Sequence, residues 1–489
     1  MTLDHFFAER TLKEAYTEER ALFLSTLMRV SREGHLCWQT TDAPELPPSV
    51  LHEKGPVVKD GSRYYLRRNW IFETTILDHV KRLRTLDPPA FHDEAKFVAQ
   101  LAQAPLLPLQ RTAIEAAFRS TLSLICGGPG TGKTYTAGHL VRLLLASKTK
   151  EKYRVALTAP TGKAATNLQS AIGISGVQAT TLHRLLRITP GENNLSSHRK
   201  IDADLVIVDE ASMVDVPLLS QLLQSIGNET RLVLLGDPDQ LPPVEAASLF
   251  AEMAALFAIR LNQSKRTNVA HLQSLAEEIN RGELNAASRL SWPFDATLPA
   301  KLFDALQPLI SYHEPDPLTC LKELDKFRIL GALRQGPYGI DALNRQIVQE
   351  ISRRIHPGQW WVLPIMITTN EQSQELYNGT CGVLIGKSRN GVHLKDGTAY
   401  FPGPVPFHKL PPFEIAFCLS VHKSQGSEFD RVLALFPPGS ENFGREALYT
   451  AVTRAKSALE IVCDEQILRL MLSKRSRRIS GFTERFAEN

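Results

Sequence analysis

Short apolar runs alternate with amphipathic, helix-like segments along the chain from about residue 100 onward. Glycine, proline or an acidic residue follows each run closely, and the first four runs are Leu122–Cys126, Val155–Thr158, Leu205–Val208 and Leu232–Leu235. This alternation is typical of a parallel sheet between helices, with its functional loops at the carboxyl ends of the strands. We therefore predict a first α/β domain over residues 101–262.

The alternation weakens after about residue 262 and later resumes. The strands predicted for a second α/β domain, residues 263–489, are Trp361–Thr368, Ile415–Val421, Val432–Phe436 and Leu459–Cys463. Gly382–Lys409 has short alternating runs, at Val383–Ile385 and Val392–Leu394, followed by a proline-rich stretch. This pattern predicts a small β insertion at about residues 380–412.

Residues 1–100 have a mostly helical pattern and carry no catalytic motif. The proline-rich segment Asp42–Lys59 is predicted to be a loop, and Pro88 and Pro89 mark a second loop before a boundary near residue 100. The predicted fold class is therefore α/β, with two parallel-sheet domains that follow a mainly helical N-terminal domain.

Length and composition suit two or three domains, because 489 residues with 43% apolar side chains can form sizeable cores without disulfide support. The chain has 56 basic and 52 acidic residues, which gives a net charge of +4. Many enzymes without a polyanionic ligand carry a similar charge, so the charge alone does not indicate nucleic acid.

Six cysteines occur, and no two share a C-x-x-C spacing, which argues against a zinc ribbon or an iron–sulfur cluster. We expect reduced thiols, as in a cytosolic protein. The first residues, MTLDHFFAER, include early acidic residues and no apolar run after basic ones, so we expect no signal peptide. Because no apolar stretch approaches about 18 residues, we also expect no membrane span and a cytoplasmic location.

A glycine-rich loop follows the first predicted strand and precedes a helical segment. It matches the pattern G-x-x-x-x-G-K-[ST] and consists of Gly127, Gly128, Pro129, Gly130, Thr131, Gly132, Lys133 and Thr134. The glycines let backbone N–H groups surround phosphates, Lys133 reaches the outer phosphates, and the Thr134 hydroxyl binds Mg²⁺. The context of strand, loop and helix favours binding of ATP with Mg²⁺ over a plain glycine-rich turn.

Two acidic residues, Asp209 and Glu210, follow the strand Leu205–Val208. Asp209 is expected to hold Mg²⁺ through water, and Glu210 to orient or deprotonate the attacking water. The alternative is an acid that simply ends a strand, but burial there is costly without a nearby cation. The loop and the acids indicate hydrolysis of a nucleoside triphosphate, but not what the hydrolysis drives. A small-molecule kinase has the same loop, although it needs only one α/β domain and a lid.

Further motifs distinguish between these possibilities. Gly236-Asp237-Pro238-Asp239-Gln240-Leu241-Pro242-Pro243-Val244 follows a strand and resembles the third motif of superfamily 1 helicases. The other motifs, in family order, are Ala159–Ala165, Thr181–Leu186, Val421–Asp430 and Tyr449–Lys456. The spellings APTGKAA, TLHRLL and HKSQGSEFD resemble the RecD group, the alpha subunits of exodeoxyribonuclease V, or RecBCD. Seven motifs occur in order over about residues 100–480, and the resemblance implies two RecA-like motor domains.

The resemblance leaves a choice between two kinds of RecD-like protein. Longer stand-alone RecD-like helicases begin with extended helix–hairpin–helix regions. Only about 100 residues precede the motor here, and two segments, Gly34–Cys37 and Arg63–Arg67, resemble the short front domain of the complex-bound subunit. This implies an N-terminal domain that binds partners, namely RecB-like and RecC-like subunits in a heterotrimer. A stand-alone helicase is the alternative.

The resemblance also implies roles around the nucleotide. Gln110 would hold the adenine, with a surface glutamine at a helix start as the alternative. Gln240 would sense the γ-phosphate. Arg266 and Arg454 would reach that phosphate from the second domain, where an arginine stabilises transition-state charge and couples closure to hydrolysis. The neighbouring Lys265 leaves the assignment of Arg266 open.

Contacts with DNA are expected from loops on both motor domains. Thr161, Gly162 and Lys163 provide a hydroxyl, backbone amides and a charge at one turn, which suits one phosphate. His183 is a further candidate, although a core histidine is the alternative in the apolar segment TLHRLL. A polar run after a predicted strand contains the other candidates, His422, Lys423, Ser424 and Gln425. The basic run Lys474–Arg478 is a weaker one, because such runs are usually solvated.

We therefore expect an ATP-dependent DNA helicase that acts on single-stranded DNA and duplex ends in double-strand break repair and recombination. The family implies 5′→3′ movement, and it implies that any nuclease activity resides in a partner subunit. Two alternatives remain open: an ATPase that clamps DNA or partners without moving, and a phosphotransferase. The first does not need Glu210 or Arg454, and the second needs an acceptor motif that we do not find.

Overall fold

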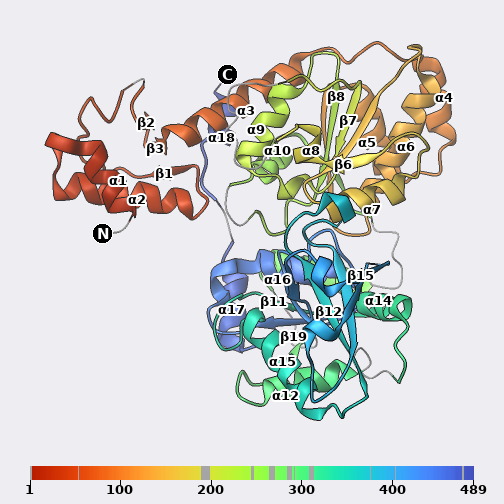
Figure 1. Cartoon of the computed structure of the whole chain (residues 1–489). Helices are drawn as coiled ribbons and strands as arrows, with labels where there is room; N and C mark the ends of the chain where they lie inside the picture. The colour runs from red at the N-terminus through yellow and green to blue at the C-terminus, as the bar shows by residue number, and fades with distance from the viewer. Residues whose placement is uncertain are drawn as a thin grey trace.

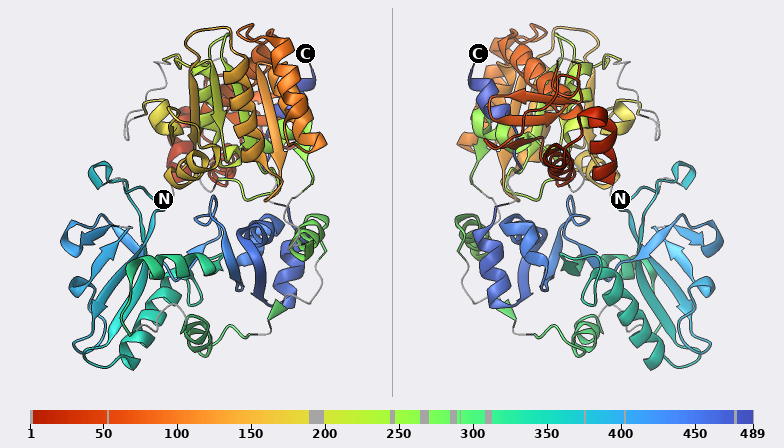
Figure 2. Two further views of the ribbon diagram at one scale, coloured as in Figure 1. Left: turned by 90° about the vertical axis from the view of Figure 1, so that its right-hand side faces the viewer. Right: turned by 90° about the vertical axis from the view of Figure 1, so that its left-hand side faces the viewer.

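The computed structural model describes most of the chain. The described residues are 3–52, 54–188, 199–243, 247–263, 270–283, 289–290, 292–307, 313–374, 376–401, 403–475 and 478–488. Figure 1 shows two α/β bodies, one above the other, and an N-terminal region that extends from the side of the upper body. The two side views in Figure 2 show the same arrangement.

The N-terminal region is mainly helical, as predicted, and also contains a small sheet that the sequence pattern did not predict. Its elements are α1 (Leu3–Leu12), α2 (Glu18–Arg32), β1 (Cys37–Gln39), β2 (Val57–Asp60), β3 (Arg63–Leu66) and α3 (Arg67–Thr85). The strands form an antiparallel sheet in the order β1-β3-β2. Strands of three or four residues are too short for an alternating pattern to reveal them.

Helix α3 joins this region to the first α/β domain. Its buried Phe72, Ile76 and Val80 are spaced by four residues and therefore lie on one helix face. They pack in the same apolar core as Leu222 of α9 (Val216–Ser225). Residues on both sides of position 100 thus cover the first sheet.

The first α/β domain has a parallel sheet of six strands in the order β6-β5-β7-β8-β4-β9. The strands are β4 (Leu122–Gly127), β5 (Val155–Ala159), β6 (Ala179–Thr181), β7 (Leu205–Val208), β8 (Arg231–Gly236) and β9 (Ile259–Leu261). The other helices are α4 (Glu94–Gln103), α5 (Pro108–Phe118), α6 (Lys133–Ser147), α7 (Gly162–Ile172), α8 (Leu182–Leu185) and α10 (Phe250–Phe257). All four strands predicted here are confirmed, and the short edge strands β6 and β9 extend the sheet.

Both faces of this sheet are covered by helices. Successive residues of a strand point to opposite faces. Leu124 of β4 therefore packs in the core with α3, α9 and α10, whereas its neighbour Ile125 packs in the core with α5, α6 and α7. Burial on both faces explains why the strands have continuous apolar runs.

The second α/β domain has a parallel sheet of five strands in the order β10-β19-β18-β11-β17. The strands are β10 (Arg289–Leu290), β11 (Phe327–Gly331), β17 (Cys418–Ser420), β18 (Phe429–Phe436) and β19 (Ala455–Cys463). Its helices are α11 (Ala270–Arg281), α12 (Leu298–Ala305), α14 (Pro317–Lys326), α15 (Ile340–Arg354), α16 (Gly444–Arg454) and α17 (Glu465–Ser473). The predicted strands Val432–Phe436 and Leu459–Cys463 are confirmed, but the pattern did not predict β11. Of the predicted strand Ile415–Val421, only Cys418–Ser420 lies in this sheet.

A separate antiparallel sheet corrects one prediction for this domain. Its order is β15-β14-β13-β12-β16, with β12 (Trp360–Ile367), β13 (Cys381–Lys387), β14 (Thr398–Tyr400), β15 (Pro404–Pro406) and β16 (Phe413–Ile415). The segment that we predicted as a strand of the parallel sheet, Trp361–Thr368, is a strand of this other sheet instead. It is buried along almost its whole length, and a continuous apolar run does not show which sheet a strand joins.

The predicted insertion is confirmed as a β structure, with one local error. Val383–Ile385 lies in β13, but Val392–Leu394 is not a strand, and Leu394–Asp396 forms a short 3₁₀ helix. The prolines that begin and end β15 lie on an edge strand of the sheet, where a missing N–H group leaves few strand partners unsatisfied.

The C-terminal segment returns from the second α/β domain to the N-terminal region. The backbone N–H groups of Leu36 and Cys37 donate to the carbonyl of Ile479, at 2.9 and 3.4 Å. Helix α18 (Phe482–Ala487) then packs against α3 and α10, near the C-terminal mark in Figure 1.

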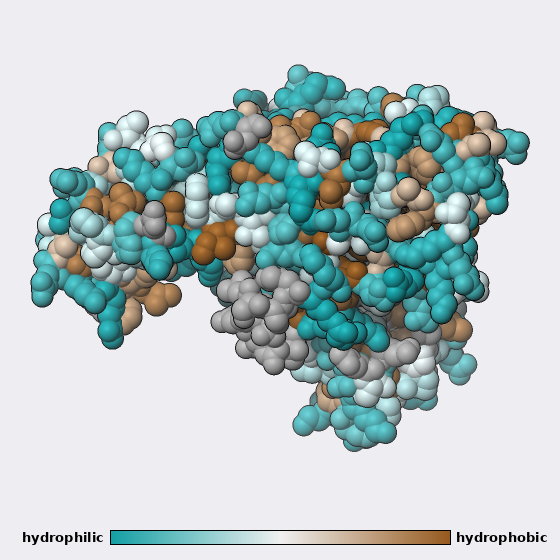
Figure 3. All heavy atoms as spheres, turned by 90° about the horizontal axis from the view of Figure 1, so that it is seen from above, coloured by the Kyte–Doolittle hydropathy of each residue, from teal (hydrophilic) through white to brown (hydrophobic). Residues whose placement is uncertain are grey.

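Figure 3 views the molecule from above and shows the N-terminal region projecting to one side, with apolar residues on this face in small groups among hydrophilic ones. Within the described ranges, no helix combines the length and the apolar character that crossing a membrane requires.

Candidate nucleotide and DNA site

The glycine-rich loop connects β4 to α6, as the sequence predicted. Gly130 and Gly132 have φ angles of +74° and +83°, a left-handed conformation that favours glycine. At Gly132 a Cβ atom would also lie 2.5 Å from Nε2 of Gln110. Helix α6 begins at Lys133, so the free N–H groups of its first turn face the position that an anion takes in such loops.

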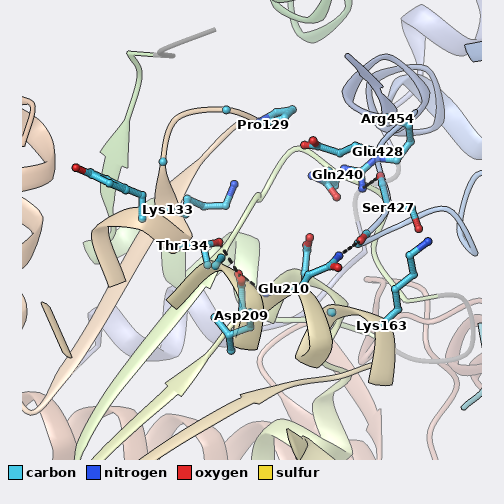
Figure 4. A pocket seen from close by; sticks show the side chains of 18 of the residues that line it. Pro129, Lys133, Thr134, Lys163, Asp209, Glu210, Gln240, Ser427, Glu428 and Arg454 are labelled. Atoms are coloured by element: carbon cyan, nitrogen blue, oxygen red, sulfur yellow. Dashed lines mark hydrogen bonds between the residues drawn. The ribbon is translucent and has the colours of Figure 1, made fainter. Parts of the chain in front are cut away.

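Lys133, Thr134 and Asp209 gather at the end of this loop (Figure 4). Nζ of Lys133 donates to the carbonyl oxygens of Gly127 and Gly128, at 2.6 and 3.2 Å. The Thr134 hydroxyl donates to Oδ2 of Asp209 at 3.0 Å. Burial raises the pKa of Asp209, and the charge of Lys133 opposes this rise. A hydroxyl and a carboxylate beside a phosphate-binding loop are oxygen ligands that fit Mg²⁺.

Glu210 has a backbone conformation that few residues adopt. Its φ of 51° and ψ of 39° are left-handed, which costs a residue with a Cβ atom about 1–2 kcal/mol. Strained backbone conformations cluster at functional sites, although Lys13 and Arg187 of this chain also have positive φ angles. Its N–H donates to Oδ1 of Asp209 at 2.9 Å. Burial and then Asp209 raise the pKa of Glu210, whereas Arg454 and Lys133 lower it.

A cavity of ≈ 580 Å³ lies between the two α/β domains (Figure 4). The first domain lines it with Pro129, Lys133, Thr134, Lys163, Asp209, Glu210 and Gln240. The second domain lines it with Ser427, Glu428 and Arg454. Because side chains of both domains form its walls, the shape of this cavity depends on how the domains are placed relative to each other.

Arg454, at the end of α16, brings a buried positive charge from the second domain. Its side chain is 3% exposed, and Nη1 donates to the Ser427 carbonyl at 3.0 Å. Nε and Nη2 donate to the Thr453 hydroxyl, at 3.3 and 3.0 Å. These contacts hold the guanidinium close enough to Glu210 to lower the pKa of that carboxyl.

Gln110 is buried behind the glycine-rich loop, so it is not the surface glutamine of the alternative interpretation. Nε2 donates to the Thr131 carbonyl at 3.1 Å, and Oε1 accepts from the Leu107 N–H at 3.1 Å. The side chain therefore supports the loop, and its contact with adenine stays a prediction. Arg266 and Lys265 lie outside the described residues, so their roles also stay predictions.

The turn before α7 carries three of the predicted DNA contacts. Thr161 accepts a hydrogen bond from the first turn of α7 and so begins that helix. A Cβ atom at Gly162 would lie 2.9 Å from the Tyr377 side chain, so the two residues are in close contact. Nζ of Lys163 lies 6.0 Å from the centre of the Phe429 ring. Because Tyr377 and Phe429 belong to the second domain, this turn lies at the domain boundary.

His183 is exposed on the short helix α8, next to the buried Leu182. The alternative interpretation of His183 as a core histidine is therefore wrong. A contact between His183 and DNA stays a prediction that its exposure permits.

The predicted DNA contacts of the second domain occupy the turn after β17. The Lys423 side chain is half-buried, and its Nζ donates to Oε1 of Glu414 at 2.8 Å. His422 lies edge-on to the Phe443 ring, and burial lowers the pKa of His422 to about 4. A DNA phosphate that binds Lys423 would compete with Glu414 for the ammonium group.

Ser424 and Gln425 point inward in this conformation. The fully buried Ser424 hydroxyl donates to the Val421 carbonyl at 2.7 Å. Nε2 of Gln425 donates to the Leu241 carbonyl of the first domain at 2.8 Å. These side chains support the turn and the domain boundary, and a direct DNA contact by either one stays a prediction.

The basic run Lys474–Arg478 is described except for Ser476 and Arg477. A Cβ atom on Gly34 would lie 2.6 Å from the guanidinium carbon of Arg478. The charge of Arg478 also lowers the pKa of His422. Arg478 therefore lies between the N-terminal region and the turn after β17.

The family described as AAA domain matches residues 110–246, and the family described as UvrD-like helicase C-terminal domain matches residues 415–462. The RecBCD enzyme subunit RecD of Mycolicibacterium smegmatis is 33% identical over an aligned length of 493 positions, gaps included, and the match covers 92% of this chain and 87% of that relative. The chain belongs to the RecD family.

The chain is also similar to part of a longer protein and to a solved structure. The ATP-dependent RecD2 DNA helicase of Deinococcus radiodurans is 30% identical over 73% of this chain but only 49% of its own length. A solved Pif1 helicase from Candida albicans covers 76% of this chain and 97% of its own, at 18% identity and a TM-score of 0.47. The match with the RecD subunit therefore covers more of both chains than the match with RecD2.

From the sequence we predicted no role for Asp237, Tyr449 or Thr450, although all three lie in the helicase motifs. The Tyr449 hydroxyl donates to Asp237 at 3.0 Å, and the Thr450 hydroxyl accepts from the Leu241 N–H at 2.9 Å. One signal was present: Thr450 lies four residues before Arg454 and therefore on the same helix face. The partner of each residue lies in the other domain, which a motif does not reveal.

Proposed function

We propose that this RecD-family chain is an ATP-dependent DNA helicase that moves 5′→3′ along single-stranded DNA, as one subunit of a RecBCD-type helicase–nuclease in double-strand break repair and recombination. The proposed bounds of its two motor domains are residues 101–262 and 263–489, with α18 at the end of the second range packed against α3 and α10. One observation carries the proposal: Asp209 and Glu210 of the first domain line the same cavity as Arg454 of the second. A nucleotide in that cavity touches both domains, so its hydrolysis changes their relative position.

ATP with Mg²⁺ is the proposed cofactor. Thr134 and Asp209 would hold Mg²⁺, which would supply positive charge to neutralise the charge that develops on the phosphates. Lys133 would contact the outer phosphates. Glu210 orients or deprotonates the attacking water, because its carboxylate follows Asp209 directly and faces the same cavity.

Other residues complete the proposed nucleotide site. Arg454 and Arg266 stabilise the charge of the transition state from the second domain. Gln240 contacts the reacting end of the nucleotide, and Gln110 contacts the adenine. Of these four, Arg454 and Gln240 line the cavity.

Single-stranded DNA runs across the boundary between the motor domains in this proposal. Thr161, Gly162 and Lys163 contact its backbone from the first domain, and His183 is exposed to contact it. The turn of the second domain contributes His422, Lys423, Ser424 and Gln425. Because both turns flank the same boundary, closure of the domains around ATP changes the distance between DNA contacts, which is how hydrolysis drives stepping.

The proposed partners are RecB-like and RecC-like subunits in a heterotrimer that acts on duplex ends in the cytoplasm. The N-terminal region binds these partners, and a partner carries the nuclease activity. The relatives named RecBCD enzyme subunit RecD support this assignment. A stand-alone helicase is the second candidate, supported by the match with RecD2.

Two parallel assays test the motor function. ATP turnover is measured with and without single-stranded DNA, and strand separation is measured on duplexes with a 5′ or a 3′ tail, with Glu210→Gln as the control. The proposal expects DNA-stimulated turnover and separation of the 5′-tailed duplex. Stimulated turnover without separation would indicate a clamp, and turnover that depends on a small acceptor instead of DNA would indicate a phosphotransferase.

Purification of the native protein tests the partners, because a single-chain species would contradict the heterotrimer.

A further inference from the structure

Three side chains form a continuous hydrogen-bonded chain across the domain boundary. The Tyr449 hydroxyl, on α16 of the second domain, donates to Oδ2 of Asp237 at 3.0 Å. Nε2 of Gln240 donates to the same oxygen at 3.1 Å. All three residues are buried, with exposed fractions of 4%, 1% and 6% for Tyr449, Asp237 and Gln240. The position of α16 is thereby connected to the amide of Gln240, which lines the nucleotide cavity.

Asp237 determines which end of the Gln240 amide faces it. A carboxylate only accepts hydrogen bonds, so the NH₂ group must face Asp237 and the amide oxygen must turn away. Oδ1 of Asp237 accepts from the Asp239 N–H at 3.1 Å, which holds the carboxylate in place. Burial and the charge of Asp237 raise the pKa of Tyr449 well above its ordinary value, so its hydroxyl remains a donor at neutral pH.

The amide oxygen of Gln240 has a free position for a donor. Oε1 is buried and accepts no hydrogen bond from the described residues. The unpaired Oε1 of Gln240 is an acceptor, so it suits a ligand that brings an O–H donor. A phosphate oxygen is itself an acceptor and would need a donor from the protein instead. The attacking water is the O–H donor that hydrolysis brings to this cavity, and a glutamine orients that water in other nucleotide hydrolases.

The same loop has two further attachments to the second domain. The Leu241 N–H donates to the Thr450 hydroxyl at 2.9 Å, and Nε2 of Gln425 donates to the Leu241 carbonyl at 2.8 Å. Gln425 belongs to the turn that is predicted to contact DNA. The loop that carries Gln240 is therefore attached both to α16, which carries Arg454, and to the predicted DNA turn.

We propose that Tyr449 is a positioning residue for ATP hydrolysis: through Asp237 it holds the Gln240 amide with Oε1 toward the attacking water while α16 is docked on the first domain. This rests on the proposed ATPase site and revises the contact proposed there for Gln240: its amide oxygen contacts the attacking water beside the γ-phosphate rather than the γ-phosphate itself. In that step the water oxygen bonds to the γ-phosphorus, and the bond to the β,γ-bridging oxygen breaks. ADP and inorganic phosphate form, and the water proton passes through Glu210 to solvent.

Tyr449→Phe removes only the hydroxyl and tests the proposal. Steady-state ATP hydrolysis is measured with the full chain in its native assembly, with and without single-stranded DNA. We expect kcat to fall about 10–100-fold, as for a misplaced reacting group, while KM for ATP stays within about twofold of wild type. Asp237→Asn should lower kcat similarly. The new asparagine amide can donate to Oε1 of Gln240, so the Gln240 amide can turn and no longer point Oε1 toward the water. The double variant should fall no further, since both changes break one chain of contacts.

Tyr65→Phe is the matched control. Tyr65 is also buried, and its hydroxyl also donates to a buried carboxylate, Oε1 of Glu73, at 3.1 Å. It lies in the N-terminal region and does not line the nucleotide cavity. Each variant loses one buried hydrogen bond, so both should lower the thermal unfolding temperature, but only Tyr449→Phe should lower kcat.

Three results would overturn the proposal. They are an unchanged kcat in Tyr449→Phe, an equal loss of kcat in Tyr65→Phe, and a rise in KM large enough to explain the whole loss of kcat/KM. Such a rise in KM would indicate that Tyr449 acts by packing against the glycine-rich loop, because a Cβ atom on Gly128 would lie 3.1 Å from the Tyr449 hydroxyl. If DNA does not stimulate ATP turnover of the wild-type protein, the proposed motor function is contradicted. The role of Tyr449 can still be tested in that case, because the kcat values of wild type and variants without DNA can be compared.

Discussion

Nη1 of Arg485 donates to Oε1 of Glu73 at 2.9 Å, and this ion pair joins α18 to α3 across 412 positions of the chain. Glu73 is fully buried and also accepts from the Gly481 N–H and the Tyr65 hydroxyl, each at 3.1 Å. Helix α17 packs in the second domain, and α18 follows it in the chain. The ion pair therefore holds the C-terminal segment that connects the second domain to the N-terminal region.

Glu73→Ala is expected to destabilise the fold strongly. It leaves the Arg485 side chain, which is 10% exposed, without its carboxylate. Removing one partner of a buried ion pair typically costs about 3–5 kcal/mol. Glu484→Ala is the control. Glu484 lies next to Arg485 in α18, and its carboxylate, which pairs with Arg63, is 62% exposed. Such surface ion pairs contribute about 0–1 kcal/mol. Denaturant unfolding of the full chain measures both, and equal losses would show that the buried pair does not hold α18.

The stability of the same junction should depend on pH through Glu252. This carboxyl accepts from the hydroxyls of Ser480 and Thr483, at 2.6 and 3.3 Å. Burial raises the pKa of Glu252 from 4.5 to about 7. The folded protein then keeps a proton that the unfolded chain releases, so the contribution of Glu252 is full below pH 4.5 and is lost as pH rises through about 7.

The free energy of unfolding should therefore fall over that interval, and Glu252→Gln should make the decline shallower. Unfolding of both proteins at about pH 5 and about pH 8 measures the difference. Parallel pH profiles for variant and wild type would rule out Glu252 as the titrating group.

Lys133→Gln should abolish ATP hydrolysis and leave the fold intact. Within the described part of the chain, the ammonium group donates hydrogen bonds to two loop carbonyls, and its proposed task requires a phosphate. Losing such an electrostatic contact typically costs on the order of 10²–10³ in rate. Turnover and thermal unfolding are measured together, and a variant that keeps more than about a tenth of wild-type DNA-stimulated turnover would contradict the assignment.

Glu210→Gln should bind ATP but barely hydrolyse it. The amide keeps the size of the side chain and the backbone contact with Asp209, but it cannot act as a base. Equilibrium ATP binding and turnover are therefore expected to separate. Equal losses of both would instead assign Glu210 a structural role.

Lys163→Ala and Lys423→Ala should each weaken binding of single-stranded DNA regardless of its sequence. Each change removes one phosphate contact, so the slope of log affinity against log salt should become shallower by about 0.7. ATP affinity without DNA should stay close to wild type in Lys423→Ala, because Lys423 does not line the nucleotide cavity, whereas Lys163 does and its variant is decided by the salt slope. Lys96→Ala, at an exposed position on α4, is the matched control and should keep the wild-type slope. If both test variants also keep it, the basic run Lys474–Arg478 becomes the leading candidate for the DNA track.

By itself, the sequence determined the phosphate loop, the acids Asp209 and Glu210, and the four strands of the first domain that were predicted from it. These features depend on neighbours in the chain. Glycines allow the left-handed loop at Gly130 and Gly132, and a continuous apolar run marks a strand that is buried on both faces. Local rules suffice wherever the residues that cause a feature are close together in the chain.

Only the tertiary structure decided which sheet Trp360–Ile367 joins, that Ser424 points inward, and that Tyr449 meets Asp237. An apolar run has the same pattern in a parallel and in an antiparallel sheet. A polar run after a strand has the same composition whether its side chains face DNA or the protein. The Tyr449–Asp237 contact joins residues 212 positions apart in different domains, and such a contact forms only because packing of the two cores brings both partners to one boundary.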